Sequence, residues 1–245
     1  MLYGLDISNW QKTLNLGNLP AFDFCICKAT EGTNFVDPYC DRWVQWLIGH
    51  QKLFGFYHFM TAKDPRAQAD YFVTNCKGYF KLGIPVLDIE SDRIGDWASY
   101  AQTFVDRVHV LTGVYPVIYA SAAYLPRFAG TQVPKTCGLW VAGYPAPQRA
   151  DWDSLPKLPY KIAPWQFAAM WQFTSAGKLA GFGERLDLDV AYMTREQWMK
   201  YANPDAKVSD TAELPKVSSQ GKTFHFSTSL FDIDVTMKGG KTNGS

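Results

Sequence analysis

The sequence predicts an α/β fold built as an irregular barrel, and three observations support this interpretation. Eight short runs rich in β-branched and aromatic residues recur up to residue 192. Stretches with helical spacing of apolar residues follow the early runs. This alternation lapses late in the chain, and eight is the number of strands that closes a parallel α/β barrel. We therefore expect a barrel whose last strands are joined by loops.

The eight runs have the length and composition of buried strands, and each is interpreted as one strand of the barrel. In chain order they are LYGLDIS (2–8), DFCICKAT (23–30), LFGFYHF (53–59), PVLDIE (85–90), PVIYAS (116–121), LWVAGY (139–144), AAMWQFTS (168–175) and LDLDVAY (186–192).

Helical spacing predicts three helices, over residues 39–52, 64–79 and 96–113. Asp64 and Asp96 stand where N-caps are needed, and Gly113 stands where the third helix should end. Residues 144–168 are rich in Pro and Trp and show no sustained helical period. This segment is the main reason to expect an irregular barrel.

The chain changes character near Asn203, so we divide it into a barrel over residues 1–202 and a tail over residues 203–245. The tail begins as a polar linker, and an alternating stretch from residue 223 then predicts a β-hairpin. A lone hairpin is marginal in water, so these strands should dock on the barrel, pair with another chain or bind the wall of a cell.

Charge and cysteine content exclude several classes of protein. The formal net charge is +1 and there is no basic run, which argues against nucleic acid or an acidic membrane surface as the main partner. The five cysteines are odd in number and contain no C-x-x-C pair, so neither a disulfide framework nor a zinc site is expected. The N-terminus lacks the pattern of a signal peptide, and no apolar run approaches the ~18 residues of a membrane span. We expect synthesis in a reducing cytoplasm and no membrane insertion.

Two acids, Asp88 and Glu90, end the apolar strand PVLDIE. Side chains two residues apart in a strand share a face, about 6.6 Å apart along the chain. Asp88 could simply cap a turn and Glu90 could be a solvated loop acid. A buried strand makes that less attractive, because two carboxyls in a low-dielectric pocket raise one pKa and keep one group protonated near neutrality. Glycoside cleavage requires such a proton donor.

Other polar side chains stand at the predicted carboxyl ends of strands, where barrel enzymes place their sites. Each has an ordinary structural explanation, such as a turn acid, a hydrogen-bonded core histidine or an aromatic core residue. Their convergence on one face of the barrel favours a site. They are Asp6, Lys28, Glu31, His58, Tyr119, Trp140, Tyr144, Gln172, Asp187 and Asp189.

The ordered motifs DISNWQ, KATEG, GFYHF, VLDIE, PVIYAS, LWVAGY, MWQFTS and LDLDV resemble the glycoside hydrolase family 25 muramidases, the lysozymes of bacteria and bacteriophages. The resemblance covers roughly residues 1 to 200. It implies a modified (β/α) barrel with fewer helices than strands. It also implies hydrolysis of the β-1,4 bond from N-acetylmuramic acid to N-acetylglucosamine in bacterial peptidoglycan, with no cofactor and no metal.

The resemblance also implies roles for individual residues. Glu90 matches the general acid, and Asp88 matches a carboxylate that either attacks C1 or orients the substrate's own 2-acetamido group for that attack. Asp6 and Asp187 match the remaining acids of the groove, with Asp187 preferred to Asp189. Motif neighbourhood adds the substrate-binding candidates Lys28, Glu31, Tyr57, Tyr119, Trp140 and Gln172.

Two other classes of function stay open at this stage. D-x-E at the end of a fourth strand also occurs in chitinase-like N-acetylhexosaminidases, although the longer acidic run upstream of such a motif is missing here. A non-catalytic protein that binds cell-wall carbohydrate is the second, suggested by the abundant aromatic residues. For biological role we expect a phage endolysin acting on the cell wall, with an exported autolysin or toxin as the alternative.

Overall fold

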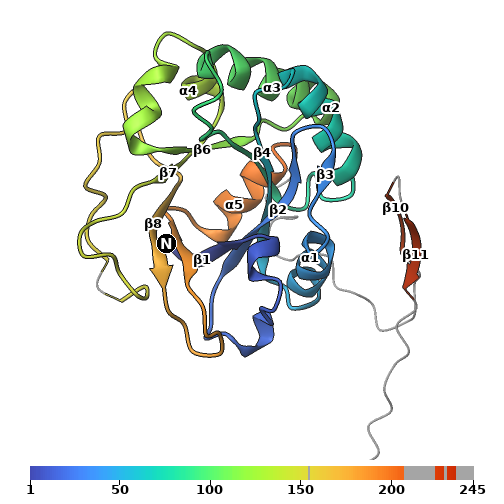
Figure 1. The fold of residues 1–245 in the computed structure, drawn as a ribbon, viewed down its shortest axis with the longest axis vertical. Helices are drawn as coiled ribbons and strands as arrows, with labels where there is room; N and C mark the ends of the chain where they lie inside the picture. The colour runs from blue at the N-terminus through green and yellow to red at the C-terminus, as the bar shows by residue number, and fades with distance from the viewer. Residues whose placement is uncertain (154, 207–223, 229–230, 236–245) are drawn as a thin grey trace, which may run out of the picture.

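The computed structural model describes residues 1–153, 155–206, 224–228 and 231–235. Its centre is a nine-stranded sheet in the order β1-β9-β8-β7-β6-β5-β4-β2-β3. Because β1 also pairs with β2, eight strands close into a barrel and β3 lies outside it (Figure 1). The barrel strands are β1 (Leu2–Ile7), β2 (Phe24–Glu31), β4 (Leu53–Phe59), β5 (Ile84–Asp88), β6 (Val117–Ser121), β7 (Leu139–Ala142), β8 (Met170–Gly177) and β9 (Leu186–Ala191).

All eight predicted strands are therefore present, and one strand was not predicted. Strand β3 (Phe35–Val36) pairs antiparallel with the end of β2. Two residues are too few to give a periodic signal.

The barrel is mixed rather than all-parallel. Strand β9 runs antiparallel to both β8 and β1, whereas the other neighbours in the barrel are parallel. The connection over residues 178–185 is short, and a parallel crossover needs a dozen or more residues. A reversal of chain direction is the connection that fits this length.

Helices cover the early part of the barrel and are sparse in the later part, as predicted. Asp64 and Asp96 cap two of them, accepting hydrogen bonds from Ala67 N at 2.7 Å and Ser99 N at 3.0 Å, and Gly113 ends the third predicted helix with φ of +75°. Within the described residues from Gly143 to Ala169, no helix forms. The helices are α1 (Cys40–Gly49), α2 (Pro65–Cys76), α3 (Trp97–Thr112), the short α4 (Val133–Thr136) and α5 (Arg195–Ala202), with 3-10 turns at Asn9–Gln11, Leu16–Asn18 and Ala122–Phe128.

Helix α5 closes one end of the barrel (Figure 1). Its Trp198 is fully buried and its ring centroid lies 4.7 Å from that of Phe24 on β2. Together with residues of the barrel interior such as Ile26 and Met170, these side chains form one of two apolar clusters. With this end filled, the opposite end of the barrel is left for a ligand.

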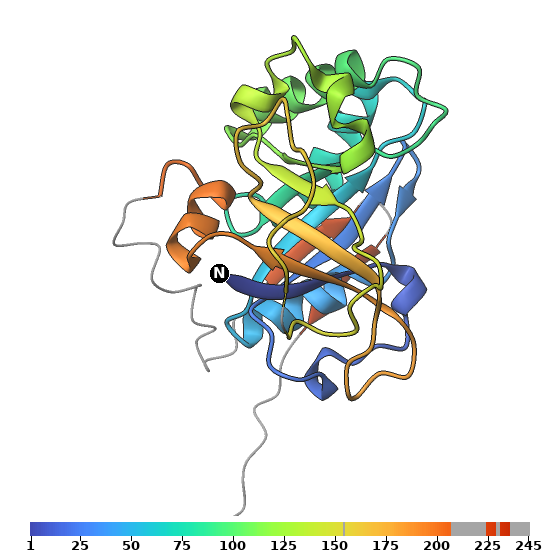
Figure 2. The same ribbon diagram turned by 90° about the vertical axis from the view of Figure 1, so that its left-hand side faces the viewer.

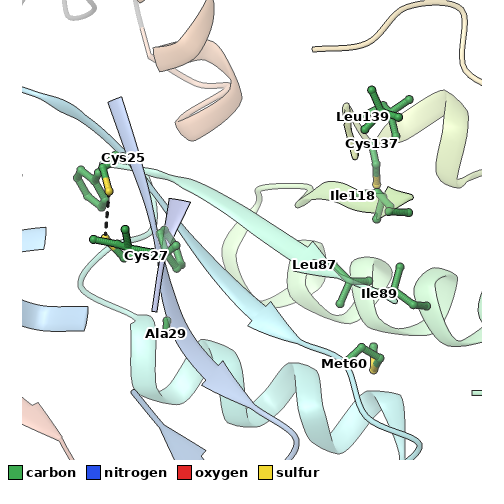
Figure 3. Close-up of a cluster of buried hydrophobic side chains, with 14 of the residues drawn as sticks. Cys25, Cys27, Ala29, Met60, Leu87, Ile89, Ile118, Cys137 and Leu139 are labelled. Atoms are coloured by element: carbon green, nitrogen blue, oxygen red, sulfur yellow. Dashed lines mark hydrogen bonds between the residues drawn. The ribbon is translucent and has the colours of Figure 1, made fainter. Parts of the chain in front are cut away.

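The second apolar cluster lies between the sheet and the outer helices. Figure 2 shows the ribbon of the sheet and helices in a turned view. Figure 3 shows part of it, where Leu87, Ile118 and Leu139 extend from neighbouring strands. Cys25 and Cys27 share one face of β2, with their Sγ atoms 3.9 Å apart. All five cysteines are free and buried.

Beyond residue 206 the described part of the tail is a pair of strands, β10 (Phe224–Thr228) and β11 (Phe231–Val235), which pair antiparallel. Most of the predicted linker, residues 207–223, lies outside the described residues. Among the residues that are described, no helix has the length and apolar character needed to cross a membrane.

The closure of the barrel can be tested at Gly4 of β1. A Cβ atom at this position would lie 2.5 Å from the ring and the carbonyl oxygen of Phe24. We expect Gly4→Ala to lower the free energy of unfolding by about 1–3 kcal/mol, because backbone has to move to admit the methyl group. Urea denaturation measures this change.

The matched control is Gly49→Ala at the end of α1, where a Cβ meets no atom within 4 Å. Alanine has the higher helix propensity, so this variant should be as stable as the wild type or slightly more stable. Equal free energies of unfolding of the two variants would show that β1 and β2 can move apart to admit a side chain at position 4 without loss of stability.

Candidate active site

A cleft of about 320 Å³ opens at the end of the barrel opposite α5, and every barrel strand contributes a side chain to it. Strand β9 runs in the opposite direction, so it contributes from its beginning rather than its end. Its residue Asp187 stands beside Asp6 in the β1–β9 register. One residue from each barrel strand in the cleft is, in chain order, Asp6, Lys28, Tyr57, Asp88, Tyr119, Trp140, Gln172 and Asp187, and Glu90 joins them just after β5.

The structure thus brings together nine of the ten predicted site residues. Glu31 is the exception, because its side chain faces a neighbouring pocket. It still contacts the site, since its carboxylate accepts a hydrogen bond from Lys28 Nζ at 2.6 Å.

Asp88 is the more enclosed of the central acid pair, with 7% of its surface exposed. Burial raises the pKa of its carboxyl well above the ordinary value, the charge of Glu90 raises it further, and Lys28 opposes both effects. Within the described residues, the Oδ1 atom of Asp88 has no hydrogen-bond partner although it is buried. A buried acceptor without a donor is costly, so this atom is suited to receive an N–H or O–H group from a ligand.

Glu90 is more exposed and lies at the open side of the cleft. Partial burial raises the pKa of its carboxyl, and Lys28 lowers it. The two acids therefore differ in access: Glu90 can reach a bond that lies across the cleft, while Asp88 is held beneath it.

Lys28 is the cation whose charge lowers the pKa of both acids. Its Nζ atom lies 5.0 Å from the centroid of the Phe59 ring and 5.4 Å from that of Phe35. These rings and the Glu31 carboxylate hold the ammonium group in place. Lys28 thereby moderates the mutual repulsion of the acids without neutralising either by direct contact.

A chain of hydrogen bonds fixes the other side of the cleft. Gln172 Nε2 donates to Asp6 Oδ2 at 2.7 Å. The hydroxyl groups of Tyr119 and Tyr144 donate to Gln172 Oε1 at 2.8 and 2.7 Å. These contacts set the orientation of the amide and hence of the Asp6 carboxyl.

The acids of β9 lie at different depths. Asp187 lines the cleft, while Asp189 is fully buried and accepts a hydrogen bond from Trp140 Nε1 at 2.8 Å. Burial raises the pKa of Asp6 well above its ordinary value, and the charges of Asp189 and Asp187 raise it further. Of the two acids of LDLD, Asp187 is the one that a ligand can touch.

Sequence reasoning missed several residues of the cleft wall. Trp10 lines the cleft and is 79% exposed. It lies in the 3-10 turn that Ser8 caps, where Ser8 Oγ accepts a hydrogen bond from Trp10 N at 3.4 Å. The S-x-x-Q spacing of Ser8 and Gln11 is a capping-box signal that could have located this turn. The other missed residues are Ile7, Ser8, Gln11 and Phe59, whereas Tyr144, named above at the end of a predicted strand, does line the cleft.

His58 has the ordinary structural role considered above. It is fully buried, and its ring nitrogens lie 2.8 Å from Thr30 Oγ1 and 3.3 Å from Gln68 Oε1. Burial lowers the pKa of this imidazole to about 3. Across the described residues, no group of three or more His, Cys, Asp or Glu side chains is placed to bind a metal ion.

The acid cluster makes a prediction about stability. Burial, followed by the charge of Glu90, raises the pKa of Asp187 from 3.8 to about 6. Between these values the folded chain binds more protons than the unfolded chain, so the free energy of unfolding falls as the pH rises through this window. We expect Asp187→Asn to flatten this dependence and to be more stable than the wild type at pH 7 by roughly 1–2 kcal/mol.

Urea denaturation at several pH values between 4 and 7 measures the effect. Glu184→Gln is the control, because this exposed acid lies outside the cleft lining. An unchanged pH dependence in Asp187→Asn would contradict the raised pKa.

Comparison with known proteins finds lysozymes among the relatives and an endolysin catalytic domain with the same fold. Lysozyme M1 of Streptomyces globisporus is 28% identical over 207 residues, covering 75% of this chain and 65% of that protein. The bacterial lysozyme from Streptomyces coelicolor is 26% identical, with a TM-score of 0.70 over 84% of this chain and 98% of that chain. The catalytic domain of endolysin ply40 from bacteriophage P40 of Listeria monocytogenes shares the fold, with 24% identity and a TM-score of 0.63 over 78% of this chain and 93% of that chain.

The sequence also matches the family described as Glycosyl hydrolases family 25 over residues 5–182. This match runs from β1 to the loop before β9 and includes the central acid pair. The chain belongs to glycosyl hydrolases family 25.

Proposed function

We propose that the barrel is an N-acetylmuramidase that hydrolyses the β-1,4 bond between N-acetylmuramic acid and N-acetylglucosamine in bacterial peptidoglycan. The observation that carries the proposal is the pairing of Asp88 and Glu90, both with raised pKa values, in a cleft built by all eight barrel strands. Family membership and two relatives named as lysozymes support the same activity.

Glu90 is the general acid of this proposal. It lies at the open side of the cleft, and partial burial keeps a larger fraction of its carboxyl protonated than in water. Its proton goes to the glycosidic oxygen as the bond to C1 breaks. Once ionised, the same carboxylate accepts a proton from the water that completes the reaction.

Asp88 orients the substrate's own nucleophile, the 2-acetamido group, in this proposal. Its buried Oδ1 atom lacks a donor within the described residues, and the N–H of a 2-acetamido group is a donor that the substrate always carries. Accepting this hydrogen bond orients the acetamido oxygen toward C1 and stabilises the positive charge that develops on the acetamido group. Attack by that oxygen and a second attack by water give net retention, an exception to the usual carboxylate nucleophile.

The remaining residues bind and orient sugar rings. Asp6 and Asp187 lie together at the cleft and accept hydrogen bonds from hydroxyl groups, with Asp6 held by Gln172. Sugar rings pack against aromatic faces, and the cleft provides them at several positions. These residues are Trp10, Tyr57, Tyr119, Trp140 and Tyr144.

The biological setting stays a prediction. We propose the role of a phage endolysin that meets the cell wall after synthesis in the host cytoplasm. The fold shared with the ply40 catalytic domain is compatible with this role and with that of a bacterial autolysin. The tail strands β10 and β11 are candidates for wall binding or self-association.

Digestion of purified peptidoglycan tests the proposed bond and the role of Glu90. The wild type should release fragments with N-acetylmuramic acid at the new reducing end, identified by mass spectrometry. Glu90→Gln should be slower by ~10²–10⁴-fold, because it cannot donate the proton. Glu196→Gln on α5, at the other end of the barrel, is the control and should cleave normally.

New N-acetylglucosamine reducing ends would refute the proposed bond. Binding of peptidoglycan without any cleavage would mean that this barrel is a carbohydrate-binding protein.

The acetamido route is tested with glycan whose N-acetyl groups have been removed. This substrate should bind but be cleaved at least ~10²-fold more slowly, because the nucleophile is missing. Chemical re-acetylation of the same glycan should restore cleavage, which controls for damage to the polymer. Normal cleavage of the de-N-acetylated glycan, or an aspartyl ester trapped at Asp88, would refute this route.

A further inference from the structure

A second pocket, of about 520 Å³, opens beside the catalytic cleft. It lies between the ends of β2 and β4, the short strand β3 and the loop that follows Glu90. We name it the side pocket. Its floor includes the half-buried rings of Phe35 and Phe59, and its rim includes Asn34, Lys63 and Arg93.

The side pocket adjoins the catalytic cleft. Phe59 lines both spaces. The ion pair between Lys28, which lines the cleft, and Glu31, which lines the side pocket, spans the boundary between them. Ser91, the residue after Glu90, also lines the side pocket. A group attached to a sugar beside Glu90 therefore has a short path into this space.

The two spaces carry opposite charge. The cleft holds Asp6, Asp88, Glu90 and Asp187 against one cation, Lys28. In the side pocket the one acid, Glu31, is already paired with Lys28, whereas two exposed cations stand on the rim. An anionic group that the catalytic acids repel is attracted to this rim.

Both rim cations are available to a ligand. Among the residues that the structure describes, Lys63 Nζ donates to two neutral oxygens, Asn34 Oδ1 at 3.2 Å and Thr33 Oγ1 at 3.4 Å. Over the described ranges, neither Lys63 nor Arg93 forms an ion pair. The acids next to them in sequence, Asp64 and Asp92, do not line the pocket, and Asp64 caps α2.

We propose that the side pocket binds the acidic peptide stem of the substrate, an inference that rests on the proposed function. In peptidoglycan the stem is attached through the lactyl ether of the muramic acid, the sugar whose C1 is attacked. It must leave the cleft close to Glu90. Lys63 and Arg93 pair with carboxylates of the stem, and Phe35 and Phe59 contact its methyl and methylene groups.

Three forms of the same glycan strand test this proposal: strands with free stem carboxylates, strands with those carboxylates amidated, and strands whose stems have been removed by an amidase. The enzymes are the wild type, Lys63→Gln/Arg93→Gln, and the control Arg66→Gln/Lys77→Gln. The control removes the same charge from exposed positions of α2 and the residue after it, away from the pocket lining.

The wild type should show a KM about 5- to 10-fold lower on strands with free stem carboxylates than on amidated strands, the effect of two partly exposed ion pairs. Lys63→Gln/Arg93→Gln should lose this preference while keeping kcat, and the control should retain it. Added salt should reduce the preference of the wild type.

Equal KM values of the wild type for strands with free and with amidated stems would overturn the proposal. An increase in the KM of the double variant that is the same on all three strands would also overturn it. A side pocket that binds a further sugar would give that second result. Cleavage of none of the three strands would instead overturn the proposed function, and this inference with it.

Discussion

Barrel closure by β1 is the constraint on which the rest of the structure depends. This strand pairs in parallel with β2 on one side and antiparallel with β9 on the other. The first pairing requires Gly4, because the Phe24 ring and carbonyl occupy the space of a side chain. The second places Asp6 opposite Asp187. A single strand therefore closes the core and brings acids from the two ends of the barrel sequence to the same cleft.

The same closure buries several carboxyl groups, and their raised pKa values give the site its protonated acids. Asp6, Asp88, Asp187 and Asp189 lose hydration in the barrel mouth, and burial is the largest cause of each raised pKa. Such groups destabilise the fold at neutral pH, which is the usual relation between an active site and the stability of its scaffold. Trp140, Gln172 and Lys28 limit the cost by hydrogen bonding or charge. The raised pKa of Glu90, on which its proposed role as proton donor rests, has the same origin in lost hydration.

The sequence was informative where burial leaves a pattern. Continuous apolar runs identified all eight barrel strands, and Asp64, Asp96 and Gly113 identified helix ends. Asp88 and Glu90 stood out because acids interrupt an apolar strand. The direction of β9 could not be predicted, since residue alternation is the same in parallel and antiparallel strands.

The depth of side chains was also hidden from the sequence. Asp187 and Asp189 share a face of β9, and only the three-dimensional register places one at the cleft and the other beneath it. Trp10 lies in a 3-10 turn, where an exposed aromatic residue has no periodic context. The side pocket assembles from segments around residues 31, 61 and 91, which are distant in sequence.

Separation of charge between the two spaces is consistent with a branched substrate. In the proposed reaction the acids that act at C1 would repel carboxylates on the branch of the same sugar. A further cation in the cleft itself would lower the pKa of Glu90, as Lys28 already does in part. Placing Lys63 and Arg93 beyond the Phe59 ring and the Lys28–Glu31 pair avoids this conflict. Their charge can attract the branch while solvent and distance weaken their effect on the proton donor. A barrel with one undivided cleft would have to weaken either the acid or the contact with the branch.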